Sequence, residues 1–282
     1  MTQIPKIIHQ IWLQGENNIP KDYPNYSESW KKLNPNFEYI LWDQSNIENL
    51  IKKYFPDFLS KFNNYPKLVQ KVDAAKYIIL YVYGGVYVDM DLECLKNIDD
   101  LLNYQKIMLL KCDLNILTKL YFYHTSGTIL QNCFAASVPK HNFWIHCVQL
   151  MMNQDIKQSY FELLEKYIFR TTGPKLITDA YYTYPSNNEI MLIDTSLFEP
   201  LSSCEYDLYN CSRDDCRGKL VNSYAFHHFG AKHSTHGWLS NSGKLVLPLF
   251  CTNQNKIIYA SCFITVLLVV CCLLLLYRGK SI

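Results

Sequence analysis

A chain of 282 residues is long enough for one large domain with a full hydrophobic core. Its formal net charge of +2 is close to neutral, so the charge does not favour a nucleic acid or a strongly acidic partner, and no nucleic-acid role is expected. The first residues carry Pro5 and polar side chains where a signal peptide would have its apolar core, so no signal peptide is predicted.

The first predicted elements are a strand, a helix and a second strand. The strands are expected over residues 6–12 and 37–42, and the short helix lies between them over 26–33. This order suits an α/β sheet that binds ligands at the carboxyl ends of its strands. His9, inside the first strand, is expected to be a structural residue with a satisfied hydrogen bond. Another helix is expected over 45–54, capped by Ser45 or Asn46.

Residues 67–95 carry the most informative pattern in the chain. Apolar residues recur every three or four positions from residue 67 onward, which predicts a helix with Asp73 and Lys76 on one face. Gly84 and Gly85 are expected to end this helix, because glycine adopts left-handed backbone conformations without steric cost.

After the two glycines the pattern changes to the alternation of a β-strand. Its apolar face is expected to carry Val86, Val88, Met90 and Leu92. Its polar face is expected to carry Tyr87, Asp89, Asp91 and Glu93. Asp89 and Asp91 then project the same way where the strand ends, and two unpaired carboxylates at that spacing repel each other. Mn²⁺ or Mg²⁺ removes this conflict and also binds substrate phosphates, so a metal–diphosphate site is predicted, although Asp-x-Asp alone also occurs at solvated strand ends.

The residues around this pair make the metal interpretation more specific. Residues 73–91 fill every position of the pattern D-x-x-[RK]-Y-x-x-L-Y-x-Y-G-G-[IV]-Y-x-D-x-D. This stretch resembles the DxD signature of glycosyltransferase family 32 and of the related catalytic domains of glucosylating clostridial toxins. The one departure is mild: the base is most often arginine, and Lys76 lacks its bidentate fork.

The resemblance implies an α/β fold with a GT-A-type, Rossmann-like nucleotide-binding sheet flanked by helices, over residues 1–250. It also implies a metal-dependent glycosyltransferase that binds Mn²⁺ or Mg²⁺ and a nucleotide-diphosphate sugar, and that acts on a glycan or glycolipid acceptor. The sugar and the base, UDP or GDP, stay open. Trp12 is expected near the base, where its indole could stack, although core packing explains it equally well.

The resemblance also implies roles for individual residues. Asp89 and Asp91 would hold the metal, and Tyr87 could donate to a phosphate. Asp73 would accept hydrogen bonds from sugar hydroxyls, and Lys76 would offset the charge of Asp73. Asn132 begins an element that is expected to follow a strand and to end near the reacting carbon.

An amide such as that of Asn132 binds hydroxyls but cannot act as a nucleophile. No carboxylate is placed as an obvious nucleophile elsewhere. By the resemblance, the reaction is expected to retain the anomeric configuration. Because no nucleophile is placed, front-side attack assisted by the leaving phosphate is the expected route.

The middle of the chain is expected to add two short strands and two helices. The strands fall over residues 106–110 and 191–193, and the helices over 143–152 and 159–169. Thr172-Gly173-Pro174 is a recurrent phrase of the family and is expected to shape the floor of the cleft.

Four histidines lie within residues 224–238, but their spacing is not that of a closed zinc site. By the resemblance, a histidine from this stretch completes the metal shell, and His228 is the chosen candidate, ahead of His227. Trp238 is expected to cover the phosphates. Gly237 replaces the serine that usually precedes this tryptophan, so one hydroxyl contact to phosphate is lost.

Residues 257–277 are uniformly apolar or small and uncharged, and a short basic tail, 278–282, follows. A helix of this length spans a bilayer, so these residues predict a single C-terminal transmembrane helix. The membrane is expected to be an endomembrane of the Golgi or ER type, or a viral membrane. A buried globular helix is the alternative. The side of the membrane stays open. The missing signal peptide favours the cytoplasm, whereas the basic tail and the sequons at Asn25 and Asn210 favour the lumen.

Two other functions compete with an active transferase. One is a catalytically inactive nucleotide-sugar-binding membrane protein, but the intact acidic residues speak against it. The other is a metal-dependent phosphohydrolase, which needs more acidic ligands than the sequence places near Asp89.

Overall fold

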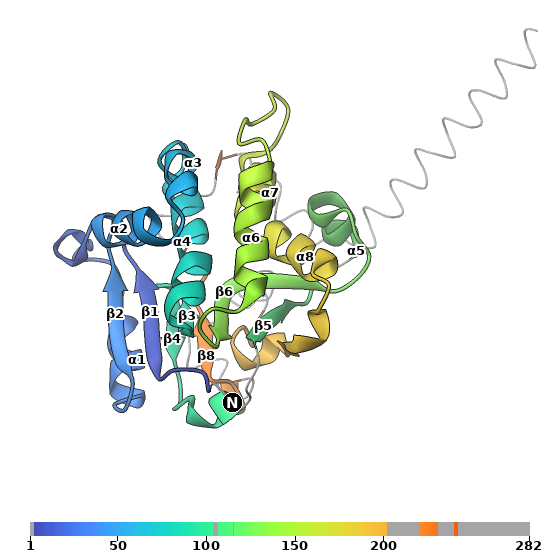
Figure 1. Ribbon diagram of the computed structural model, residues 1–282. Coiled ribbons are helices and arrows are strands. Elements are labelled where there is room, and N and C mark those ends of the chain that lie inside the picture. The colour runs from blue at the N-terminus through green and yellow to red at the C-terminus, as the bar shows by residue number, and fades with distance from the viewer. Residues whose placement is uncertain (1–2, 104–106, 115, 202–219, 231–239, 242–282) are drawn as a thin grey trace, which may run out of the picture.

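A six-stranded sheet lies at the centre of the fold, and helices flank it (Figure 1). The computed structural model describes residues 3–103, 107–114, 116–201, 220–230 and 240–241. In spatial order the strands are β2 (Glu38–Trp42), β1 (Ile7–Ile11), β3 (Gly85–Val88), β6 (Ile129–Ser137), β5 (Ile107–Cys112) and β7 (Ile190–Ile193). The sheet is mixed, because β6 runs antiparallel to both β3 and β5 while the other neighbours are parallel. The expected α/β class is confirmed.

Two further strands and a set of helices complete the described chain. β4 (Leu92–Cys94) and β8 (Ala225–His227) pair antiparallel as a separate small sheet. The main helices are α1 (Ser27–Leu33), α2 (Gln44–Tyr54), α3 (Leu59–Asn63), α4 (Leu68–Tyr83), α6 (Asn142–Asn153), α7 (Leu164–Thr171) and α8 (Pro174–Thr183).

Hydrophobic cores fill both faces of the sheet. On one face, helices α4, α6 and α8 contribute Tyr77, Trp144 and Ile177 to a core that includes Tyr87 of β3. On the other face, Val86 and Val88 of β3 join a core that includes Trp30 of α1, Met108 and Phe134. Successive side chains of β3 therefore point to opposite sides of the sheet, as predicted, but Tyr87 lies in a hydrophobic core and not on a polar face.

The predicted strand–helix–strand opening is confirmed, since β1 and β2 are parallel neighbours. The cap of α2 was predicted wrongly. Asp43, and not Ser45 or Asn46, is the N-cap, because its extended backbone lets its carboxylate accept from the amide of Asn46 at 2.8 Å.

Two glycines end α4 as predicted. Gly84 has φ 65° and Gly85 has φ 83°, which glycine adopts readily. Packing requires glycine as well: a Cβ on Gly84 would lie 2.6 Å from Pro139 N, and one on Gly85 would lie 2.7 Å from Ile7 O. Both the backbone conformation and the close approach of neighbouring strands therefore demand glycine here.

The strand after these glycines is shorter than predicted. β3 ends at Val88, and a turn in which Leu92 N donates to Asp89 O at 3.2 Å leads into β4. The chain leaves the sheet here because Asp91 bonds elsewhere: its carbonyl accepts from His228 N at 3.0 Å, and its carboxylate accepts from Gly230 N at 2.7 Å. The Asp89–Asp91 pair thus lies in a turn between two sheets.

Two boundaries in the middle of the chain were also predicted wrongly. Asn132 lies inside strand β6, not after a strand. The helix expected over 159–169 begins only at Leu164, because residues 154–163 form a hydrogen-bonded loop. The strands expected over 106–110 and 191–193, and the helix over 143–152, are confirmed as β5, β7 and α6.

Several predictions fall outside the described residues: the sequon at Asn210, Gly237, Trp238, the apolar segment 257–277 and the basic tail 278–282. Among the helices of the described ranges, none combines the length and apolarity needed to cross a bilayer.

His9 is a structural residue, as predicted. It is fully buried; its Nε2 lies 3.0 Å from Gly84 O, and its Nδ1 accepts from Trp42 Nε1 at 3.1 Å. Burial lowers the pKa of His9 to about 4, while the bond to Gly84 opposes that fall. The imidazole is therefore neutral in the folded protein.

This burial predicts an acid-sensitive contribution to stability. The unfolded chain protonates His9 near its ordinary pKa of about 6.5, whereas the folded chain does so only near 4, so lowering the pH between these values favours unfolding. From pH 7 to pH 5 this should remove about 2 kcal/mol of unfolding free energy. Urea titrations of wild type and His9→Gln at both pH values test this: the loss should be smaller by that amount in the variant. An equal loss in both proteins would contradict it.

Candidate active site

Lys76 lies at the centre of the candidate site, buried between two carboxylates. Its Nζ lies 3.0 Å from Asp73 Oδ1 and 3.1 Å from Asp89 Oδ1, and it donates to the carbonyl of Asn132 at 3.0 Å. Burial alone lowers the pKa of Lys76, but the charges of Asp89 and Asp73 outweigh burial and raise it. Three residues predicted from sequence, Asp73, Asp89 and Asn132, therefore contact the ammonium group of a fourth, Lys76.

Asp73 is held by neighbours on both carboxylate oxygens. Asn132 Nδ2 donates to Oδ1 at 2.8 Å, and Thr172 Oγ1 donates to Oδ2 at 3.2 Å. Burial raises the pKa of Asp73 to about 6, although attraction to Lys76 opposes this. Its side chain is 6% exposed, so in this conformation Asp73 chiefly positions Lys76 and Asn132.

Asp89 is the more accessible of the two carboxylates at Lys76, with 28% of its side chain exposed. Tyr87 OH donates to Asp89 Oδ1 at 2.6 Å, and Lys76 reaches the same oxygen. Burial raises the pKa of Tyr87 well above its ordinary value, and Asp89 adds to this, so the phenol keeps its proton. The hydrogen bonds from described side chains fall on Oδ1, which leaves Oδ2 for a ligand.

Asp91 faces His227, and Glu199 lies behind that histidine. His227 Nε2 lies 3.2 Å from Asp91 Oδ2, and its Nδ1 bonds to Glu199 Oε1. Burial alone lowers the pKa of His227, but Asp91 and Glu199 raise it well above the ordinary value. Cys133 Sγ, 3.6 Å from Glu199 Oε1, completes this support. A carboxylate behind a histidine fixes the orientation of the ring, as it does for histidines that bind metals.

The atoms of Cys133, Glu199 and His227 lie within 4.8 Å of one another, close enough to hold a cation. However, the thiol and the imidazole both bond to Glu199 Oε1. Burial also raises the pKa of Cys133 well above its ordinary value, which keeps the thiol neutral. This group is better described as a support for His227 than as a separate metal site.

His228, the histidine predicted as a metal ligand, lies beside Glu93 instead of Asp91. Its Nε2 lies 3.1 Å from Glu93 Oε2, and its ring stacks on Tyr26 with centroids 4.1 Å apart. The structure brings its neighbour His227, and not His228 itself, to the carboxylate of Asp91.

Trp12 borders the same site through Tyr23. The two rings lie 5.1 Å apart, and the pKa of Tyr23 is raised by burial and by the charges of Asp91 and Asp89. Trp12 Nε1 is buried and has no hydrogen-bond partner among the described residues. The expected role at the nucleotide base stays a prediction.

Among the described residues, carboxylates outnumber cationic groups in this part of the molecule. The contacts above involve five acidic residues: Asp73, Asp89, Asp91, Glu93 and Glu199. Within the described ranges, the groups paired with them are Lys76 and the imidazoles of His227 and His228. The excess negative charge favours a divalent cation, and carboxylate and imidazole are ligands that suit Mn²⁺. The side chains present therefore fit the expected metal.

Sequence reasoning missed Glu199, Glu93 and Tyr26. None of the three stands in a motif. The loop that carries Glu199 and the turn before α1 that carries Tyr26 are distant in sequence from Asp91. The alternation beyond Asp91 did place Glu93 on the polar face, which was the only available signal.

Comparison with known proteins identifies the family. Residues 20–108, which include Lys76, Asp89 and Asp91, match the family model described as a glycosyltransferase sugar-binding region containing a DXD motif. An uncharacterized glycosyltransferase of Acanthamoeba polyphaga mimivirus is 32% identical over 217 residues, which is 74% of this chain and 80% of that protein.

A fungal enzyme matches over a smaller share of its length. Inositol phosphoceramide mannosyltransferase 1 of Schizosaccharomyces pombe is 31% identical over 189 residues, 65% of this chain and 53% of that enzyme, so this chain spans about half of the fungal protein. Among solved structures, the PaToxG glycosyltransferase is similar over 65% of this chain and 71% of that one, with a TM-score of 0.44 and 18% identity. This similarity is too distant to bear on the chemistry. The extent of the viral match and the DXD region together show that the chain belongs to the DXD-containing glycosyltransferases of the family 32 type and is itself a glycosyltransferase.

Proposed function

We propose that the chain is a metal-dependent, retaining glycosyltransferase of the GT-A type that moves a hexose from a nucleotide-diphosphate sugar to a glycan or lipid-linked acceptor. The observation that carries this proposal is the Asp89–Asp91 turn, which presents two carboxylates in an acidic site beside a buried Lys76. The name of the fungal relative, an inositol phosphoceramide mannosyltransferase, supports mannose as the hexose and an inositol-bearing sphingolipid as the acceptor.

Asp89 and Asp91 would hold Mn²⁺ or Mg²⁺ in this proposal. Bound there, the ion supplies Lewis-acid stabilisation of the charge that develops on the departing diphosphate. The chain contributes orientation. Lys76 keeps the Asp89 carboxylate in one rotamer, and Tyr87 OH fixes the oxygen of Asp89 that points inward. With these contacts made, Oδ2 is the oxygen of Asp89 that faces a ligand.

The sugar and the base would contact residues on either side of the acidic turn. Asn132 can bind a sugar hydroxyl through its amide oxygen, since its Nδ2 is engaged with Asp73. Trp12 and Tyr23 offer an aromatic surface beside the carboxylates, which suits a nucleotide base. An amide in place of a carboxylate is consistent with front-side attack, in which orientation and electrostatics carry the reaction.

The third metal ligand can be assigned by comparing two adjacent histidines. His227 faces Asp91, whereas His228 faces Glu93, so His227→Asn should weaken Mn²⁺ binding by about tenfold or more and His228→Asn should weaken it much less. Titration of free Mn²⁺ by electron paramagnetic resonance measures both affinities without any activity assay. The reverse order would restore His228 as the ligand.

A donor screen tests the function as a whole. Purified full-length protein with Mn²⁺ should release the nucleoside diphosphate from one of UDP-glucose, UDP-galactose, UDP-N-acetylglucosamine or GDP-mannose, and EDTA should abolish this release. Binding of a donor without hydrolysis or transfer would instead favour an inactive nucleotide-sugar-binding protein. Release that persists in EDTA would contradict the metal dependence.

A further inference from the structure

The loop that joins α6 to α7 carries two aromatic side chains into solvent. Tyr160 and Phe161 are each 93% exposed, the highest values among the large apolar residues of the described chain. Their rings contact each other edge to face, with centroids 4.9 Å apart. Exposing two adjacent aromatic residues in this way is unfavourable in water, so the tip requires an explanation.

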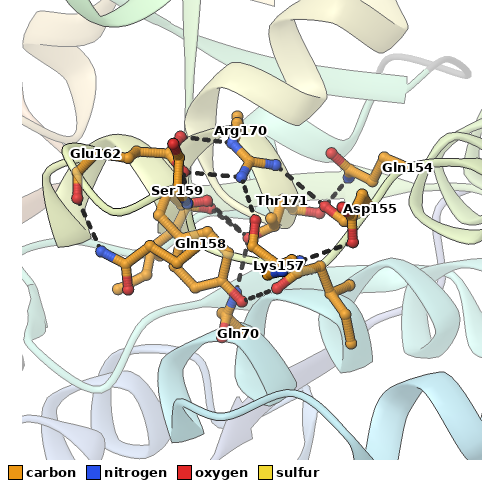
Figure 2. Close-up of polar contacts among 12 residues, drawn as sticks. Gln70, Gln154, Asp155, Lys157, Gln158, Ser159, Glu162, Arg170 and Thr171 are labelled. Atoms are coloured by element: carbon orange, nitrogen blue, oxygen red, sulfur yellow. Dashed lines mark hydrogen bonds and ion pairs between the residues drawn. The ribbon is translucent and has the colours of Figure 1, made fainter.

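The loop below this tip is braced by a polar network (Figure 2). Arg170 binds the carboxylate of Glu162 through Nε at 2.5 Å and Nη2 at 2.8 Å, and also donates to the carbonyls of Asp155 and Lys157. Tyr167 OH donates to Ile156 O at 2.5 Å. The tip is therefore held in a defined place and presented outward.

The same network reaches the candidate active site. Gln154 Nε2 donates to Thr171 O at 2.5 Å, and Gln70 of α4 donates to Thr171 Oγ1 at 2.8 Å (Figure 2). The next residue, Thr172, donates to Asp73. Helix α7 has eight residues, which corresponds to a length of about 12 Å, so one short rigid element connects the tip to the site.

We propose that Tyr160 and Phe161 insert into the surface of a lipid bilayer and orient the site toward it. A bilayer suits this tip better than a protein does, because two aromatic side chains bury only about 150–250 Å² each, whereas a stable protein interface needs about 800 Å² per partner. Tyrosine is also typical of membrane interfaces, where it keeps its hydroxyl in the polar layer, and phenylalanine is among the apolar residues that interfacial segments bury.

Hydrogen-bonded polar groups beside the tip are compatible with the low-dielectric environment of a membrane interface. Gln158 Nε2 donates to Glu162 O, and Ser159 N donates to Glu162 Oε2. These groups next to the tip thus have partners inside the loop, so moving the tip into the interface does not leave them without a hydrogen bond.

Charge around the tip is compatible with anionic lipid headgroups. Three of the charged residues of the loop and of α7 that reach the surface are basic and two are acidic: Lys157, Lys166 and Arg170 against Asp155 and Glu162. Arg170 and Glu162 neutralise each other, which leaves an excess of one positive charge. Lys166 also lies 4.9 Å from the ring centroid of Tyr121, which is 40% exposed, and the adjacent Leu120 is 51% exposed. Basic residues among exposed apolar ones are the pattern of a surface that binds a membrane.

Site-specific photocrosslinking in the full-length chain tests this proposal. Phe161 is replaced by the photoreactive analogue 4-benzoylphenylalanine, and the protein is irradiated on vesicles of phosphatidylcholine and phosphatidylserine. The matched control carries the same analogue in place of Val221, which is 76% exposed and lies beside the β4–β8 sheet. Because both probes sit in the same protein on the same vesicles, the comparison does not depend on how much protein binds.

The proposal expects a phospholipid adduct at position 161 at a yield about tenfold or more above that at position 221, detected by mass spectrometry. Equal yields at the two positions would overturn it, and so would a crosslink from position 161 to a protein or to a second copy of the chain. Both labelled proteins should melt like the wild type, since neither side chain is buried. The result does not depend on the metal or on sugar transfer, so it stands or falls separately from the proposed function.

Discussion

Asp89→Asn should lower the rate of sugar transfer by about a thousandfold or more while the fold stays intact. The substitution keeps the shape of the side chain but removes the charge that would hold the cation. It also replaces one acceptor oxygen with a donor, next to Tyr87 OH and Lys76 Nζ, which both contact Oδ1. The Mn²⁺ affinity should fall together with the rate, and both can be measured on the same preparation.

A matched control separates this effect from a general loss of carboxylate charge. Asp179→Asn removes a carboxylate from α8, where Asp179 pairs with Lys175 on a half-exposed surface. That variant should transfer sugar and bind Mn²⁺ like the wild type. Near-normal transfer by Asp89→Asn under saturating donor would rule out its role in the metal site.

The central element could be predicted because its signals are local. The apolar period of α4, the two glycines and the alternation of β3 lie within one continuous stretch, and each has a single physical meaning. The family pattern also indicated that Lys76 offsets the charge of Asp73, but it did not predict that Lys76 pairs with Asp89 as well. The pattern could not predict the turn after Val88. Asp91 leaves the sheet because it accepts hydrogen bonds from the backbone amides of His228 and Gly230, which are distant in sequence.

The choice between two histidines shows why the rest of the site could not be predicted. His227 and His228 are adjacent, so they project to opposite sides of the strand end, and only the register with the partner strand decides which one meets the acidic turn. β8 pairs with β4 so that His227 lies opposite Leu92, directly after Asp91. Nothing in the sequence specifies this long-range pairing, and Glu199 is equally distant along the chain.

The loop before α7 shows a different failure. Apolar spacing predicts a helix from residue 159, and Tyr160 and Phe161 contribute to that pattern. In the structure both are exposed. Arg170 donates to the carboxylate of Glu162 and to the carbonyl of Asp155, and these bonds stabilise the loop conformation. A prediction from apolar spacing assumes that apolar residues face a core. It therefore assigns a helix wrongly where apolar side chains are exposed, as at Tyr160 and Phe161.

Lys76→Met should be the most destabilising substitution in the site. Lys76 is 2% exposed and neutralises Asp73 and Asp89, so its removal leaves two carboxylates close together without a buried cation. Breaking a buried ion pair by removing one partner costs about 3–5 kcal/mol of unfolding free energy. Urea unfolding at pH 7 measures this loss, and sugar transfer should be lost with it.

The pH dependence of that loss distinguishes electrostatics from packing. Without the ammonium, the pKa of Asp73, already raised to about 6 by burial, should rise further in the folded variant. A carboxyl with a raised folded pKa binds its proton more tightly when folded, so the deficit of the variant should shrink as the pH falls from 8 to 5. A deficit that is constant over this range would point to a packing defect.

Lys76→Arg provides the conservative control for the same position. Arginine restores the charge and is the base most often found in the family pattern. If the charge is what the site requires, the lost unfolding free energy should be recovered, and the rate of sugar transfer should return to within about tenfold of the wild-type rate. Since the longer guanidinium must fit between Asp73 and Asp89, some loss from crowding is expected. A Lys76→Met variant as stable and active as the wild type would show that the two carboxylates do not need this cation, and the arrangement proposed for the whole site would then be wrong.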